Sequence, residues 1–191
     1  MKKVLAMALC LCMVLGVFAG CGKKHSFGID YEDFESDLQT EALSLGVRLT
    51  FEKEESDIEG ETESIYSASS SDEKPSAEIL DENVSIYITR NEKKGDVKSV
   101  IIVAFGAPRG AKTRRLTPQL YRAIIPLLDK EADDAAIEDI VGKLHVDDFT
   151  EYGKNTTSAN GVKYGFDVQK CDCQANIVTH QYHIVATFYP E

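Results

Sequence analysis

The sequence lacks the short motifs that identify most catalytic and ligand-binding sites. It contains no G-x-S-x-G, no H-E-x-x-H and no regular calcium loop. The glycine pattern that cradles phosphate groups is also missing. Serines cluster in the acidic segment 54–82, which is a poor place to preorganise a catalytic triad. We therefore expect neither an enzyme nor a bound cofactor.

Positive charge is scarce as well. The chain has 21 lysine and arginine residues against 32 aspartate and glutamate residues, a net charge of −11. Nucleic-acid-binding domains usually carry a strongly basic face, so nucleic acid is not expected as a partner. The apolar run from Val4 to Ala19 has about 16 residues, fewer than the ~20 that a membrane-spanning helix needs.

This apolar run has the features of a secretion signal. It follows the positive start Met1-Lys2-Lys3 and ends in Val17-Phe18-Ala19-Gly20-Cys21. Small residues before a cysteine resemble the lipobox of bacterial lipoproteins, with Phe18 in place of the usual leucine. The resemblance covers residues 1–24. It implies a signal peptide at residues 1–20, removal of that peptide, and a diacylglyceryl group on the thiol of Cys21. An uncleaved anchor helix and a soluble secreted protein are the alternatives.

Cleavage would leave 171 residues, with 19 basic and 32 acidic side chains and a net charge of −13. Only Cys21, Cys171 and Cys173 remain, too few for a disulfide scaffold, so the fold must rest on a hydrophobic core. We expect a lipidated tether at residues 21–29 and a single domain at residues 30–191. The first predicted partner is the lipid bilayer, which lipidated Cys21 enters. The predicted location is the outer face of the cytoplasmic membrane, or the outer membrane if the host has one.

Hydrophobic periodicity predicts an α+β domain with an antiparallel sheet of about four to five strands and helices on one face. The expected order is helix, strand, acidic insert, hairpin, two helices and hairpin. One helix is expected at residues 31–45, a second after a Thr117 cap with Pro118 at its first position, and a third after Asp133 or Asp134. The remaining expectations are strands at 47–52, 84–88, 97–105, 162–168 and 177–189, a loop at 155–161 and a turn at 171–176.

The acidic insert at about residues 54–82 has an unusual composition. It holds eleven acidic residues, one lysine and seven serines. Such a segment buries too little apolar surface to fold alone, which favours a flexible loop. The alternative is an ordered hairpin, with a short edge strand at Ile65-Tyr66.

Two similar phrases indicate a possible internal repeat. Residues 102–108 read IVAFGAP and residues 184–190 read IVATFYP. Each phrase ends a predicted hairpin that follows helical sequence. We expect chance convergence of two buried strands, and a duplicated helix-plus-sheet unit is the alternative.

The segment Cys171-Asp172-Cys173 allows three interpretations: a local disulfide, two incidental thiols, or a soft metal or redox site. The nearest additional metal ligands are His180 and His183. If Lys170 pairs with Ile177, His180 lies opposite Asp167, too far from Cys173 to share an ion. We therefore predict no metal site here.

A basic stretch precedes the second predicted helix, and no acidic residue occurs between Arg109 and Leu128. Helix N-termini favour anions, so this stretch is a candidate anion-binding surface, and a solvated loop is the alternative. Its members are Arg109, Lys112, Arg114, Arg115 and Arg122. The run His145-Val146-Asp147-Asp148 could supply metal ligands, but a histidine near a helix C-terminus more often complements the helix dipole.

These features predict a membrane-anchored extracytoplasmic lipoprotein, a non-catalytic binding or accessory module of the cell envelope. Its further partner would be another envelope protein or an anionic envelope polymer. The alternative is a small envelope hydrolase or redox protein with no recognisable motif.

Overall fold

A computed structural model describes residues 26–54, 63–70, 82–91, 93–106, 116–148, 152–175 and 178–191. These residues form three helices and one seven-stranded antiparallel sheet of order β1-β2-β3-β4-β7-β6-β5. The helices are α2 (Tyr31–Ser44), α3 (Leu116–Leu128) and α4 (Asp134–Leu144). The strands are β1 (Leu49–Glu54), β2 (Glu63–Ser70), β3 (Glu82–Asn91), β4 (Val97–Gly106), β5 (Gly153–Ala159), β6 (Val162–Ala175) and β7 (Val178–Pro190).

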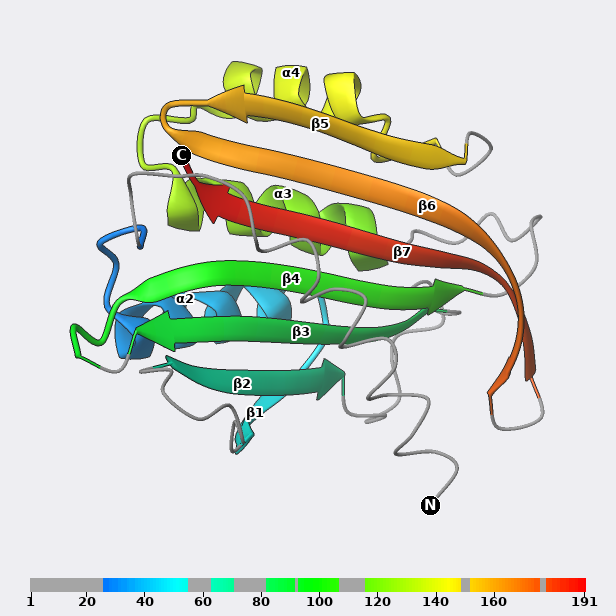
Figure 1. Ribbon diagram of the computed structural model, residues 1–191, viewed down its shortest axis with the longest axis horizontal. Helices are drawn as coiled ribbons and strands as arrows, with labels where there is room; N and C mark the ends of the chain where they lie inside the picture. Colours follow the sequence, from blue (N-terminus) through cyan, green and yellow to red (C-terminus); the bar gives the residue numbers. More distant parts are fainter. Residues whose placement is uncertain are drawn as a thin grey trace.

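The helices lie together on one face of the sheet (Figure 1). Between the two layers is one continuous core, to which α2 contributes Phe34, Leu38 and Ala42 and to which β3 and β4 also contribute buried residues. The predicted α+β class, with helices on one face of an antiparallel sheet, is confirmed.

The sheet has seven strands instead of four to five because two polar segments also form strands. β2 lies inside the acidic insert and pairs with both β1 and β3, so the flexible-loop prediction is wrong for Glu63–Ser70. Ile65-Tyr66 belongs to an interior strand, whereas an edge strand was expected. Residues 55–62 and 71–81 of the insert lie outside the described part. The predicted loop at 155–161 is also wrong, because β5 continues to Ala159 and only Asn160-Gly161 turns.

The domain begins earlier than the predicted tether boundary at residue 29. The Ser26 hydroxyl donates to a carboxylate oxygen of Asp96 at 3.1 Å. The Phe27 N–H donates to the Val97 carbonyl at 2.9 Å, and the Val97 N–H donates to the Ile29 carbonyl at 2.8 Å. Residues 26–29 are therefore bonded to the turn between β3 and β4, which shortens the tether.

Two of the three predicted helix starts are confirmed. The Asp30 side chain caps α2 by accepting from the Glu32 N–H at 2.9 Å, and Asp133 caps α4 by accepting from the Ala136 N–H at 2.8 Å. The predicted Thr117 cap is wrong, because α3 already includes Leu116 and buries Thr117 within its first turn.

The structure favours the alternative of an internal repeat over the chance convergence that we expected from the two phrases. β4 and β7 pair at the centre of the sheet, and Val103 is opposite Val185, its own counterpart 82 positions later. The same offset carries the β3–β4 register onto the β6–β7 register: Ile86 opposite Ile102 becomes Val168 opposite Ile184. When a two-fold axis relates two equivalent antiparallel strands, a residue at the axis must pair with its own counterpart. Chance similarity between two strands imposes no such pairing.

The helices obey the same offset. The buried positions Phe34, Leu38 and Ala42 of α2 correspond to Leu116, Leu120 and Ile124 of α3, which are also buried. The two halves differ most in what lies between the helix and the hairpin. The first half forms β1 and β2 between its helix and β3, whereas the second forms α4 and β5 before β6.

A circular permutant tests this duplication. Adding the offset of 82 to Gly106 gives Phe188, and subtracting it from Leu116 gives Phe34. The connection between β4 and α3 therefore corresponds to a path from Phe188 to Phe34. Fusing Glu191 to Ser26 gives that path eleven intervening residues, against nine in the natural connection. We expect a chain of residues 116–191 followed by 26–106 to unfold cooperatively by circular dichroism. A permutant opened at Asn160-Gly161, inside one half, is the control. A non-cooperative first permutant beside a cooperative control would contradict the duplication.

Candidate functional site

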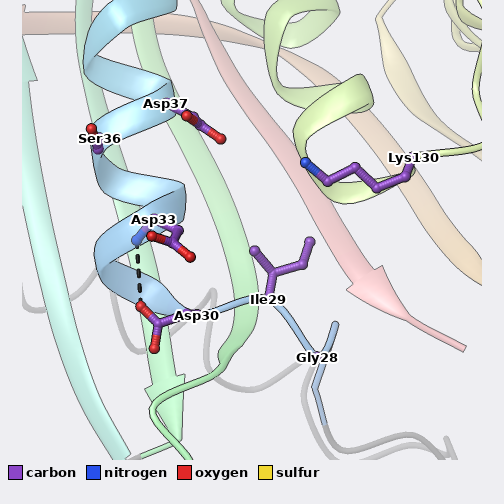
Figure 2. A pocket seen from close by; sticks show the side chains of 7 residues that line it. All are labelled: Gly28, Ile29, Asp30, Asp33, Ser36, Asp37 and Lys130. Carbon is purple, nitrogen blue, oxygen red and sulfur yellow. Dashed lines mark hydrogen bonds between the residues drawn. The ribbon is translucent and has the colours of Figure 1, made fainter.

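One depression, of about 390 Å³, lies where the start of α2 approaches the turn that follows α3. Figure 2 shows Asp33 and Asp37 on the side of α2 toward Lys130, Asp30 at the start of the helix and Ser36 at its other edge. Gly28 and Ile29 complete the lining. The depression is polar and predominantly acidic, so it is suited to a small cationic or hydrogen-bonding group rather than to an apolar ligand.

Much of this acidity follows from the way α2 begins. Asp30 is the N-cap and Asp33 lies in the first turn, where the helix dipole favours negative charge. Hydrogen bonding with the Glu32 side chain is the main influence that lowers the pKa of the Asp30 carboxyl, and the N–H groups of Asp33 and Glu32 add to it. Helix capping therefore accounts for two of the three carboxylates.

A second cluster joins α2 to β2 and β3. The rings of Tyr31 and Tyr66 stack with centroids 4.0 Å apart, and the Arg90 guanidinium lies 5.5 Å from the Tyr31 ring centroid. Arg90 also donates to the Tyr66 hydroxyl at 3.2 Å and pairs with Glu32 at 3.1 Å. This cluster connects the acidic insert to the domain, so its role is structural.

A buried carboxylate forms the third cluster. Asp129, only 4% exposed, follows α3 and accepts from the Tyr164 hydroxyl at 3.0 Å and from the Asn160 side-chain amide at 3.0 and 3.2 Å. It also accepts from the Glu131 N–H at 3.1 Å. Burial, and secondarily the Asp129 charge, raises the pKa of Tyr164, so this hydroxyl stays a donor. The sequence analysis missed this site. The feature that could have indicated it is the Asn160-Gly161 turn, because the Asn160 side-chain amide reaches the Asp129 carboxylate that follows α3.

Arg122, one member of the predicted anion-binding surface, is paired with carboxylates of the protein itself. Its guanidinium contacts Glu138 at 3.0 Å and Asp147 at 2.6 Å, and these two carboxylates raise its pKa. The fold thus brings acidic side chains from α4 and beyond against a stretch that has none in sequence. Arg109, Lys112, Arg114 and Arg115 lie outside the described residues, between Gly106 at the end of β4 and Leu116 at the start of α3.

The cysteine-containing segment is arranged differently from the prediction. Cys171 and Cys173 belong to β6, so the predicted turn at 171–176 is wrong. Lys170 pairs with Tyr182, and past a register shift Cys173 pairs with His180. The predicted separation of His180 from Cys173 is therefore wrong at the level of the backbone. The disulfide and thiol alternatives stay predictions.

His183 lies on β7 opposite Gln169 of β6 and Phe105 of β4. Burial lowers its pKa from the ordinary 6.5, and the neighbouring Asp167 charge partly opposes this shift. His145 instead ends α4 in a left-handed conformation, with φ of 55°. Asp147, its neighbour in the predicted metal fragment, pairs with Arg122.

No protein-family model, curated protein or solved structure matches the chain. Within the described residues, His, Cys, Asp and Glu side chains form no group of three that could hold a metal ion. None of the helices in the described ranges is long and apolar enough to span a membrane.

Removing the buried carboxylate should destabilise the fold. In Asp129→Ala, the Tyr164 hydroxyl and the Asn160 amide lose a charged acceptor, which should lower the free energy of unfolding by about 3 kcal/mol. Tyr164→Phe removes a single donor and should cost about half as much. Urea denaturation measures both variants, and equal losses would contradict the central position of the carboxylate.

His183 should make the stability depend on pH. Because its pKa is lowered by folding, the unfolded chain binds more protons just below pH 6.5, and stability should fall on acidification through that window. His183→Phe should be less sensitive to pH between about 7 and 5 than the parent chain. His145→Gln, at an exposed position, is the control. Parallel stability profiles for all three proteins would rule out the His183 contribution.

Proposed function

We propose that the protein is a lipid-anchored module of the bacterial cell envelope that binds a partner and catalyses no reaction. The observation that carries this proposal is the junction between signal and fold. Cys21 of the lipobox-like sequence lies five residues before Ser26, which is already hydrogen-bonded to Asp96. A tether of this length reaches about 17 Å at most, so an acylated Cys21 would hold the domain at the membrane.

The use made of the polar side chains favours binding over catalysis. Asp129, Arg122 and Arg90 are each engaged in several bonds that join elements of the fold. These groups stabilise the fold, whereas catalytic groups need to reach a substrate. A module of this kind would act through its surface, on another envelope protein or an anionic envelope polymer.

A thiol-based redox activity is the second candidate. It rests on the backbone register that pairs Cys173 with His180, and on the thiolate being the form of cysteine that reacts in redox exchange. Alkylation kinetics of the mature chain distinguish the two candidates. A thiol that reacts no faster than a free cysteine at pH 7 would exclude the redox activity and leave the binding module as the remaining candidate.

The anchor is tested by Cys21→Ser. The variant should lose incorporation of a fatty-acid analogue and move from the membrane to the soluble fraction, because the thiol is the attachment atom. Cys171→Ser serves as the matched control and should remain labelled. Undiminished labelling of Cys21→Ser would refute the lipoprotein assignment.

The binding role is tested by crosslinking in intact cells, with the anchored protein and the Cys21→Ser variant compared. A defined envelope protein or polymer captured by the anchored form alone supports the proposal. A chain that crosslinks only to itself and to lipid would contradict it.

A further inference from the structure

The tight turn between β5 and β6 contains the only asparagine of the chain that a glycine follows. Asn160 and Gly161 form this turn, with φ angles of 51° and 78°. In such a step, no side chain on the second residue shields its backbone nitrogen from the asparagine side chain. Asn160 is also exposed, so water can reach it. These are the conditions under which an asparagine deamidates without an enzyme.

The Asn160 side chain fastens this turn to the end of α3. Its amide nitrogen donates to both carboxylate oxygens of Asp129, at 3.0 and 3.2 Å, and Asp129 is buried. The Gly161 carbonyl accepts from the Glu191 N–H at 2.8 Å, which joins the same turn to the end of the chain. One asparagine side chain therefore connects the β5–β6 hairpin to the helical layer, near the C-terminus (Figure 1).

We propose that Asn160 is a modification site, at which deamidation converts the amide that binds Asp129 into a carboxylate that repels it. In the first step the backbone nitrogen of Gly161 loses its proton and bonds to the side-chain carbonyl carbon of Asn160. The bond from that carbon to the amide nitrogen breaks, and the nitrogen leaves with the proton as ammonia. Water then opens the resulting cyclic imide at either carbonyl, so the product is aspartate or isoaspartate, and water is the only other reactant.

The bonds to Asp129 slow the first step. The amide nitrogen can leave only when both hydrogen bonds break, and bonds to an ionised acceptor are stronger than those between neutral groups. The reaction therefore proceeds from molecules in which the Asn160 side chain has left Asp129. We expect it to be slower in the folded protein than in the unfolded chain, on the order of ten-fold.

Either product weakens the turn. In aspartate, a carboxylate oxygen takes the place of the amide nitrogen that now lies 3.0 Å from Asp129, so two like charges repel at short range. Because Asp129 is buried, salt screens this repulsion little. Isoaspartate adds a methylene group to the main chain of a two-residue turn, which disturbs the register of β5 with β6. Deamidation thus loosens β5, at the edge of the described sheet, from the end of α3.

Two variants separate the loss of the hydrogen bonds from the new repulsion. Asn160→Asp carries the charge of the product, and Asn160→Gly is the matched control, which removes the side chain and suits the positive φ. We expect Asn160→Asp to lower the midpoint of guanidinium unfolding by about 0.3 M more than Asn160→Gly does. The difference should vanish when Asp129→Asn removes the opposing charge. Equal midpoints for the two variants in the parent chain would overturn the repulsion and with it the proposal.

Peptide mapping by mass spectrometry tests the site itself. The full mature chain is incubated at about pH 8 in native buffer and in guanidinium chloride. We expect the peptide that contains Asn160 to gain about 1 Da in both, on the order of ten-fold faster in denaturant, with Asn91 and Asn155 unchanged as internal controls. The proposal fails if Asn91 or Asn155 converts first in native buffer. It also fails if Asn160 gains no mass there after roughly a hundred times the period that conversion takes in denaturant.

Discussion

The pairing of β4 with β7 is the interaction on which the rest of the structure depends. It runs from Val100 opposite Phe188 to Gly106 opposite Tyr182 and joins two half-sheets into one. Ile102 of β4 and Ala186 of β7 both belong to the buried core, so the two halves share a single core. A shared core matters because two small separate units would each bury too little apolar surface.

The repeated register explains why this pairing closes the fold so simply. Two units of the same design meet through equivalent strands, as the subunits of a symmetric dimer do, and Val103 meets Val185 at the axis. The departures from symmetry lie away from that axis. β1 at one edge and α4 at the other end of the domain occupy corresponding stretches of the two halves, so the same span could change from strand to helix without disturbing the centre.

The sequence predicted the elements whose apolar periodicity is strong and missed those held by tertiary contacts. β4 and β7 were found because their apolar runs are long, and the caps Asp30 and Asp133 were found because the capping signal is local. β2 was missed because it lies within a segment rich in acidic residues and serine, and its described anchor is the Tyr66 ring stacked on Tyr31. β5 was missed because its Asn-Thr-Thr-Ser sequence resembles a loop, although Asn155 donates to the Leu144 carbonyl of α4.

The candidate site residues followed the same division. The sequence near Arg122 contains no carboxylate, so its pairing with Glu138 and Asp147 could not be predicted from neighbouring residues. These two side chains reach Arg122 only in the folded chain. The separation of Cys173 from His180 depended on where the hairpin turns, and placing the turn too early changed every cross-strand partner. Register is a global property of a hairpin, so a short motif within it could not be interpreted before the register was known.

The length of the β6–β7 hairpin has a consequence for its own stability. The fourteen residues of β6 span about 45 Å. β5 pairs with β6 only as far as Val168, and β4 pairs with β7 only between Phe188 and Tyr182. Within the described residues, the outer part of the hairpin, where Cys173 pairs with His180, is therefore a two-stranded ribbon. Two strands alone are marginally stable in water, so this ribbon depends on its continuity with the wider sheet at its base.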